Sequence, residues 1–147
     1  SSHVFLKLER IMPLTNIDHY AIRTSKLEET KAFYEVLGLV DGKRPNFPFK
    51  GHWLYLGEVA LVHLISSDPN KPGGLEEYLG EAEGDKTLLG SGSVDHLAFR
   101  ATDANALKQR LEDQNIAFTE REVPNMQLFQ IFAKDPNNIT IEINYYQ

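Results

Sequence analysis

Apolar and polar positions alternate in several short stretches of the chain, which is the pattern of β-strands with one buried face. ITIEINY at 139–145 alternates in this way, and IDHYAIR at 17–23 and VDHLAFR at 94–100 are interpreted as strands as well. After IDHYAIR, Leu27, Thr30, Tyr34 and Leu37 share one stripe of a predicted helix, and after VDHLAFR the corresponding stripe contains Ala104, Leu107 and Leu111. Three extended segments follow each helix, at 39–43, 52–57 and 59–65 in the first half and at 116–122, 127–134 and 139–145 in the second. The pattern predicts two βαβββ modules.

The two modules repeat each other at an offset of 77 residues, which is the separation of the histidines in IDHYAIR and VDHLAFR. The offset also pairs Ser25 with Thr102, the predicted N-caps of the two helices, and Glu28 completes a capping box after Ser25. Gly38 pairs with Asn115, and both are residue types that readily take a positive φ where a helix ends. The chain is therefore interpreted as a duplication.

A length of 147 residues suits one domain in which two small modules share a core. Residues 1–13 are expected to be an N-terminal extension or a cloning remnant, and 14–147 a single domain. The predicted parts are module one at 14–65, a glycine-rich linker at 66–93 with a short helix at 75–79, and module two at 94–147. The fold class is α+β, with the modules in a pseudo-twofold arrangement that forms a curved mixed sheet around a metal-binding cup.

Composition and charge narrow the kind of partner. The formal net charge of −6 disfavours a nucleic acid, because phosphate backbones are normally met by a basic face. The absence of cysteine excludes a disulfide scaffold, thiolate metal ligands and a cysteine nucleophile. No apolar run approaches a membrane span, and no secretory signal is recognised. We therefore expect a cytoplasmic protein with a small-molecule partner.

Strand alternation places potential metal ligands at equivalent positions of the two modules. His19 and His96 lie in the first strand of each module, and His63 lies in LVHLI, the last strand of module one. Glu142, in ITIEINY, is its counterpart once two extra residues in the preceding DPNN turn are counted. A single strand histidine is more often structural, but four chelating residue types at paired positions favour one divalent ion, such as Zn, Fe, Ni, Mn or Co. The aspartates that precede the two strand histidines are expected to point away from this site.

Further side chains are predicted to line a substrate pocket around the ion. Arg44 is a candidate contact for an anion, at the start of the aromatic-rich segment 43–57. The alternative interpretation is that Trp53 and Tyr55 fill the core and that His52 is exposed or supports a ligand. The predicted pocket residues are Arg44, His52, Trp53, Gln130 and Phe132.

The motifs IDHYAIR, GHWLYLG, LVHLI, VDHLAFR and DPNNITIEINYY make residues 14–147 resemble the vicinal oxygen chelate superfamily. This superfamily includes glyoxalase I, extradiol dioxygenases, methylmalonyl-CoA epimerase and fosfomycin-modifying enzymes. The resemblance implies a divalent metal held by His19, His63, His96 and Glu142, with substrate oxygens bound to it. It implies a lyase or isomerase of the glyoxalase type, in which Glu142 and His63 are the catalytic residues.

The resemblance leaves the reaction open. Glyoxalase I typically has a glutamate at the position of His63, so only Glu142 remains here as a carboxylate. An Fe(II) extradiol dioxygenase would use His19, His96 and Glu142, but those enzymes commonly have a tyrosine where this chain has Phe132. A small-molecule or antibiotic-binding resistance protein is the third alternative, although such proteins lack the ligand set. A homodimer is expected, with the metal site either within one chain or shared between exchanged modules.

Overall fold

The computed structural model of the chain describes residues 16–67, 89–124 and 126–147. Module one contains strand β1, helix α2 and strands β2, β3 and β4, with the bounds Tyr20–Thr24, Leu27–Val36, Val40–Gly42, Gly51–Leu56 and Val59–Ser66. Module two contains β5, α4, β6, β7 and β8, with the bounds Leu97–Arg100, Ala104–Asp113, Phe118–Val123, Leu128–Lys134 and Thr140–Tyr146. The predicted βαβββ order is confirmed in both modules. The predicted extension at 1–13 and helix at 75–79 lie outside the described residues.

The two sheets have the same topology, because their strand orders are β1-β4-β3-β2 and β5-β8-β7-β6. In each sheet the first strand pairs in parallel with the last strand of the module, and the other pairs are antiparallel. This topology makes β1 and β5 edge strands of their sheets in the described part of the chain.

Each helix covers one face of its own sheet, and the side chains between them form the core. Buried apolar residues from both modules form one cluster, which includes Tyr34, Leu54 and Leu64 from module one and Leu111, Ile131 and Ile141 from module two. In β4 and β8 the buried positions alternate with half-buried ones, as the sequence pattern predicts. The half-buried set in these strands contains His63 and Glu142, which therefore lie on the sheet faces that the helices do not cover.

Two of the predicted helix starts are wrong by one residue. The N-cap of α2 is Lys26 rather than Ser25, and no side chain caps it. The N-cap of α4 is Asp103 rather than Thr102, and its side chain accepts a hydrogen bond from Ala106 N at 3.2 Å. The predicted helix ends are confirmed, since Gly38 has φ of 107° and Asn115 has φ of 56°.

A buried polar cluster joins the two modules. The side-chain amide of Asn137, in the turn between β7 and β8, accepts a hydrogen bond from Thr24 Oγ1 at 2.6 Å and donates one to Thr30 Oγ1 at 2.9 Å. Nearby, the Tyr34 hydroxyl donates to Asp135 Oδ2 at 3.0 Å. These contacts attach the end of β1 and one side of α2 to the β7–β8 turn.

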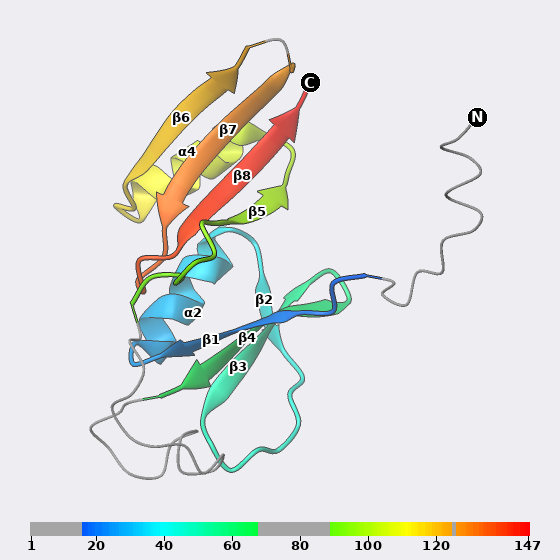
Figure 1. Cartoon of the computed structure of the whole chain (residues 1–147), viewed down its shortest axis with the longest axis vertical. Coiled ribbons are helices and arrows are strands. Elements are labelled where there is room, and N and C mark those ends of the chain that lie inside the picture. The colour runs from blue at the N-terminus through cyan, green and yellow to red at the C-terminus, as the bar shows by residue number, and fades with distance from the viewer. Residues whose placement is uncertain (1–15, 68–88, 125) are drawn as a thin grey trace, which may run out of the picture.

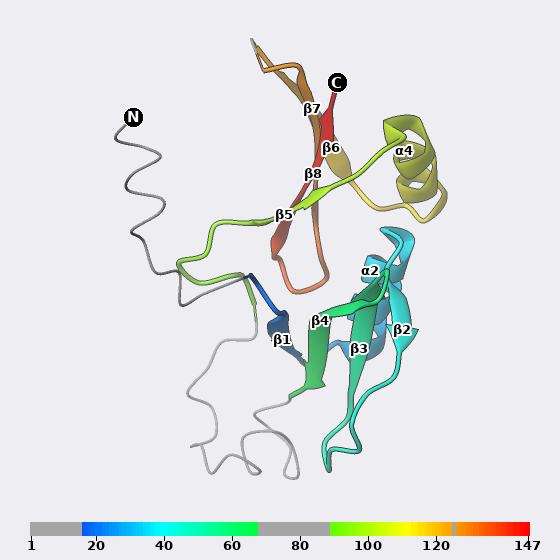
Figure 2. The ribbon, with the colours of Figure 1, turned by 90° about the vertical axis from the view of Figure 1, so that its right-hand side faces the viewer.

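The buried polar cluster forms the junction of the two modules, and the two sheets lie apart from each other within one chain. Figures 1 and 2 show module two above module one, with two separate sheets rather than one. The single curved sheet that we expected around a cup is therefore not formed inside one chain. Among the described residues, no helix is both long enough and apolar enough to cross a membrane.

Candidate functional site

The module-one half of the candidate site is a stack of three rings on the face of the first sheet that α2 does not cover, which we call its open face. The His63 ring lies between those of His19 and Trp53, at centroid distances of 3.8 and 3.9 Å and interplanar angles of 11° and 12°. Trp53 is held there because it is the cross-strand partner of His63 in the β3–β4 pair. The two imidazoles lie in nearly parallel planes, so one ring must turn before both can bind the same ion.

Hydrogen bonding and burial determine the tautomer and the protonation state of the His63 ring. His63 Nε2 donates to the carbonyl oxygen of Ala60 at 2.9 Å, which leaves Nδ1 as the nitrogen with a free lone pair. Burial lowers the pKa of His63, and the nearby charge of His19 lowers it further. A neutral imidazole with one free nitrogen can act as a metal ligand or as a base.

The module-two half of the candidate site is a histidine facing a carboxylate. His96 Nε2 lies 3.6 Å from Glu142 Oε1. Two ligand atoms on one tetrahedral ion with bonds near 2.1 Å are about 3.4 Å apart. The separation of these two atoms therefore suits a shared metal ion.

A chain of hydrogen bonds orients Glu142. Asn144 Nδ2 donates to Glu142 Oε2 at 2.9 Å, and Gln130 Nε2 donates to Asn144 Oδ1 at 3.0 Å. Gln130 is only 8% exposed, so this chain is anchored in the protein rather than in solvent. Since Oε2 is engaged, Oε1 is the oxygen of Glu142 that is left to bind an ion or take a proton.

The two aspartates that we expected to point away instead contact the histidines. His19 Nδ1 donates to Asp18 Oδ2 at 2.5 Å, and His96 Nδ1 donates to Asp95 Oδ2 at 2.7 Å. The expectation was wrong because β1 begins at residue 20 and β5 at residue 97, so the alternation of strand side chains does not apply to the Asp-His pairs. The bond to Asp95 raises the pKa of His96, and the same contact leaves Nε2 of each ring as the nitrogen available to a metal.

The structure brings the four predicted ligands together as two pairs, not as one group. His19 stacks on His63 in module one, and His96 faces Glu142 in module two. Within the described ranges, no three histidine, aspartate or glutamate side chains are grouped closely enough to hold an ion. These two pairs of candidate ligands, His19 with His63 and His96 with Glu142, are called the two half-sites below.

Of the predicted pocket residues, Arg44 and Trp53 line a cavity of about 480 Å³ together with His19 and His63. His52 lies on the opposite side of the first sheet, because neighbouring residues of β3 alternate faces. There its ring contacts Glu28 Oε1 at 2.9 Å and Asp41 Oδ2 at 3.2 Å. His52 therefore does not line the cavity beside His19 and His63, and lies instead in a separate cavity of about 360 Å³ that it shares with Arg44.

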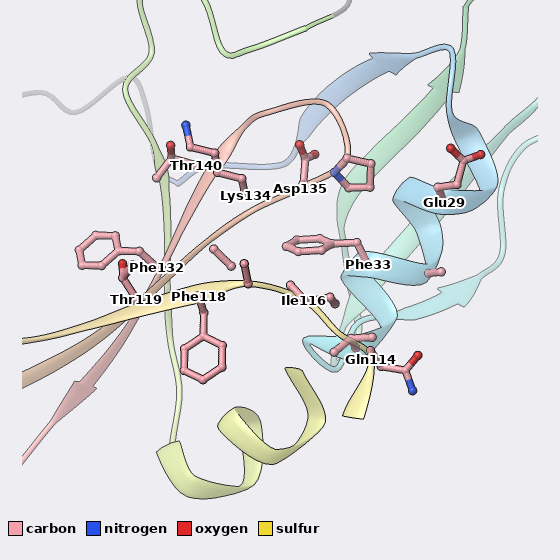
Figure 3. Close-up of a pocket in the computed structure, with 15 residues that line it drawn as sticks. Glu29, Phe33, Gln114, Ile116, Phe118, Thr119, Phe132, Lys134, Asp135 and Thr140 are labelled. Atoms are coloured by element: carbon pink, nitrogen blue, oxygen red, sulfur yellow. The ribbon is translucent and has the colours of Figure 1, made fainter. Parts of the chain in front are cut away.

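Phe132 and Gln130 lie on the open face of the second sheet, where Phe132 is the cross-strand partner of Glu142. Phe132 also lines a larger cavity of about 770 Å³ between α2 and the strands of module two. Figure 3 shows this cavity with Phe33 of α2 near Ile116, while the ring of Phe118 points away from Phe33. None of the four predicted ligands lines this larger cavity.

Three groups of residues in the half-sites were not predicted as parts of the site. Asp18 and Asp95 were dismissed, although their repetition at the 77-residue offset was a signal in the sequence. Asn144, two residues after Glu142 in ITIEINY, was not predicted to have a role. The rings of Phe47 and Phe49 were seen only as part of an aromatic-rich segment, and their packing on Arg44 depends on the conformation of a loop.

Two βαβββ modules with the same strand order define the class of this protein as a duplicated βαβββ fold. A family model described as the glyoxalase/bleomycin resistance protein/dioxygenase superfamily matches residues 16–143. The chain belongs to this superfamily. The resemblance to the vicinal oxygen chelate superfamily seen in the motifs is thereby confirmed.

Solved structures share the fold over nearly the whole chain. A glyoxylase/bleomycin resistance protein/dioxygenase domain from Frankia sp. EAN1pec is 20% identical, with 91% of this chain and 93% of that one covered and a TM-score of 0.62. Lactoylglutathione lyase from Agrobacterium tumefaciens is 22% identical, with coverages of 91% and 96% and a TM-score of 0.59. The fosfomycin resistance protein FosX from Listeria monocytogenes is 14% identical, with coverages of 91% and 95% and a TM-score of 0.60. At these identities the likeness shows the fold alone, and no curated protein matches the chain.

Proposed function

We propose that this protein is a divalent-metal-dependent lyase or isomerase of the glyoxalase type, acting on a small substrate that binds the metal through oxygen atoms. The observation that carries the proposal is the 3.6 Å approach of His96 Nε2 to Glu142 Oε1, with both side chains oriented by further hydrogen bonds. Paired donors held in this way are typical of a preorganised metal site. Membership of a superfamily that includes glyoxalases supports the same conclusion.

The donor set fits a divalent transition metal. His19, His63, His96 and Glu142 would hold it, since three imidazoles and one carboxylate suit Zn²⁺, Ni²⁺, Co²⁺, Mn²⁺ or Fe²⁺. A bound ion of this kind acts as a Lewis acid that polarises the oxygens of its substrate. The remaining chemistry falls to the side chains of the chain.

Glu142 is the side chain best placed to move a proton. Its Oε1 faces the site while Asn144 holds Oε2. In an isomerisation, Oε1, when it is not bound to the ion, takes a proton from the carbon beside a carbonyl group and returns it to the neighbouring carbon, so that the substrate is neither oxidised nor reduced overall. If His63 does not bind the metal, its neutral ring with Nδ1 free supplies a second base.

A complete site requires a second copy of the chain. A catalytic metal usually has three protein ligands or more, and each half-site supplies two. Among the described residues, no strand pairs with the outer edges of β1 and β5, and the repeat-equivalent residues Ile17 and Val94, just before these strands, are 74% and 54% exposed. We therefore propose a homodimer in which module one of each chain faces module two of its partner.

Metal binding tests the proposed function directly. Metal-stripped protein titrated with Zn²⁺, Ni²⁺ or Co²⁺ in a calorimeter is expected to bind about one ion per chain. The variants H96A and E142Q are expected to lose this binding, whereas E122Q, which changes an exposed glutamate of β6, is the matched control. Failure of the wild-type chain to bind any of these ions, or unchanged binding by H96A and E142Q, would contradict the proposal.

The reaction class is tested on the metal-loaded protein. With the hemithioacetal of methylglyoxal and glutathione as the probe, we expect isomerisation by the wild type and none by E142Q, because this variant loses a metal ligand together with the side chain that moves the proton. Oxygen consumption with catechol as the probe would indicate a dioxygenase instead.

The two aspartates next to the metal histidines are expected to strengthen metal binding. Carboxylates that accept a hydrogen bond from a ligand histidine fix the orientation of its ring, and their loss typically lowers the affinity for the metal by about 10- to 100-fold. We therefore expect D18N and D95N each to raise the dissociation constant for Zn²⁺ by such a factor in competition titrations with a chromophoric chelator. D113N, at the exposed end of α4, should leave it unchanged. Equal affinities for all three variants would show that the Asp-His bonds do not support the metal.

A further inference from the structure

The cavity beside His19 and His63 has a cationic and aromatic lining that the proposed metal chemistry does not use. It lies on the open face of the first sheet and has a volume of about 480 Å³. We call the part of it formed by Arg44, Phe47, Phe49 and Trp53 the aromatic pocket. Trp53 comes from β3, and the other three come from the loop between β2 and β3, which Figure 1 shows as a long excursion.

Arg44 is fixed in the aromatic pocket by its own loop. Its Nη2 donates to the carbonyl oxygen of Phe49 at 2.8 Å. Its guanidinium carbon lies 5.2 Å from the ring centroid of Phe47 and 5.3 Å from that of Phe49, and these two rings stack on each other at 5.1 Å. Gly51 makes room for this arrangement, because a Cβ atom there would lie 3.0 Å from Arg44 Nη2 and 2.3 Å from the backbone oxygen of Leu64.

The charge of Arg44 has no acidic partner in the described part of the chain. A guanidinium has five N–H donors, and the bond to Phe49 uses one of them. Partial burial lowers the pKa of Arg44, and the charge of Arg44 in turn contributes to lowering the pKa of His63. A preorganised cation with free donors in a partly desolvated cavity is suited to a bidentate oxyanion.

The rest of the aromatic pocket is suited to a flat apolar group. Trp53 presents an indole that already stacks on His63, and Phe47 keeps a ring that is 37% exposed. Ala21, Val59 and Ala60 complete an apolar wall around these rings. Flat rings pack on such surfaces in offset or edge-on arrangements that add to the energy of simple burial.

We propose that the aromatic pocket binds an aromatic carboxylic acid, with Arg44 on the carboxylate and the rings of Phe47, Phe49 and Trp53 against the flat part. The inference rests on the proposed function in one respect, because it names the class of substrate whose oxygens would lie next to His19 and His63. Binding of the carboxylate by Arg44 itself does not require a metal, so the two proposals can fail separately.

The single tryptophan of the chain provides a local signal for this pocket. Trp53 fluorescence and calorimetry on metal-stripped protein would be followed with benzoate, with benzyl alcohol as the uncharged aromatic probe, and with cyclohexanecarboxylate as the non-aromatic acid. We expect benzoate to bind more tightly than either of the other two. R44M is expected to weaken the binding of benzoate by about 10- to 100-fold, the usual range for a charge-assisted hydrogen bond. The binding of benzyl alcohol should be unchanged. R44K keeps the charge but not the bidentate hydrogen-bonding geometry, so its affinity for benzoate should lie between those of R44M and the wild type.

R121M, which removes an exposed arginine of β6, is the matched control and should bind benzoate as the wild type does. Retained benzyl alcohol binding shows that R44M still has a folded pocket. The proposal is overturned if the wild type binds benzoate no better than benzyl alcohol, or if R44M binds benzoate as well as the wild type. If benzoate binds through Arg44 but the chain binds no metal, the proposed function fails and the pocket assignment stands. If the chain binds metal but not benzoate, the pocket assignment fails and the proposed function stands.

Discussion

A heterodimer of two differently disabled chains is expected to regain one intact metal site. One chain carries H19A and H63A, which removes the module-one half-site, and the other carries H96A and E142A, which removes the module-two half-site. If module one of each chain faces module two of its partner, one site of the heterodimer has no ligands and the other has all four. We expect about one ion per heterodimer, against about two per wild-type dimer and none at comparable affinity in either mutant homodimer.

The two chains would be co-expressed with different affinity tags, purified through both, and titrated with Zn²⁺. A heterodimer of two chains that both carry H19A and H63A is the matched control and should bind nothing, because neither site is complete. A site within one chain predicts no recovery in any combination, since every disabled chain then keeps only two of its ligands. A properly formed heterodimer that binds no ion would therefore contradict the shared site.

Asn137→Ala is expected to lower the free energy of unfolding by about 3 kcal/mol, because two buried hydroxyls lose a partner at a cost of about 1–3 kcal/mol each. Thr24 and Thr30 are both fully buried, and each makes a hydrogen bond to the amide of Asn137. The same amide joins module one to module two. Urea unfolding followed by circular dichroism would measure the change.

Asn105→Ala, in an exposed turn of α4, is the matched control and is expected to change the stability by less than about 0.5 kcal/mol. Adding T24V and T30V to N137A should restore part of the loss, because a site in which all the polar partners are replaced has fewer unsatisfied groups. Equal stabilities of N137A and N105A would show that the polar cluster does not hold the modules together.

The secondary structure and the equivalence of the candidate ligands could be predicted from the sequence because both are local or repeated properties. The alternation in LVHLI and ITIEINY was enough to place His63 and Glu142 on the same face of equivalent strands, and both lie there. The same rule failed for the aspartates beside His19 and His96. It presumes an extended strand, and both histidines come just before their strands begin.

Other parts of the candidate site depend on contacts that leave no local pattern. His52 was expected in the pocket because it lies in an aromatic-rich segment, yet the pleat of β3 turns it toward Glu28 on α2. The orientation of Glu142 depends on Asn144 and Gln130, and Gln130 is on a different strand. Their hydrogen bonds follow from the β7–β8 register, which the pattern of single residues does not specify.

By itself, the sequence determined that this protein has two copies of one βαβββ module and that each copy carries two potential ligands on its open face. Periodicity decides which side chains share a face, and duplication decides which positions are equivalent. Only the tertiary structure decided that the two open faces do not meet within one chain. That outcome follows from bonds between residues far apart in the chain, such as Thr24 and Asn137, which are 113 positions apart and fix the junction of the modules.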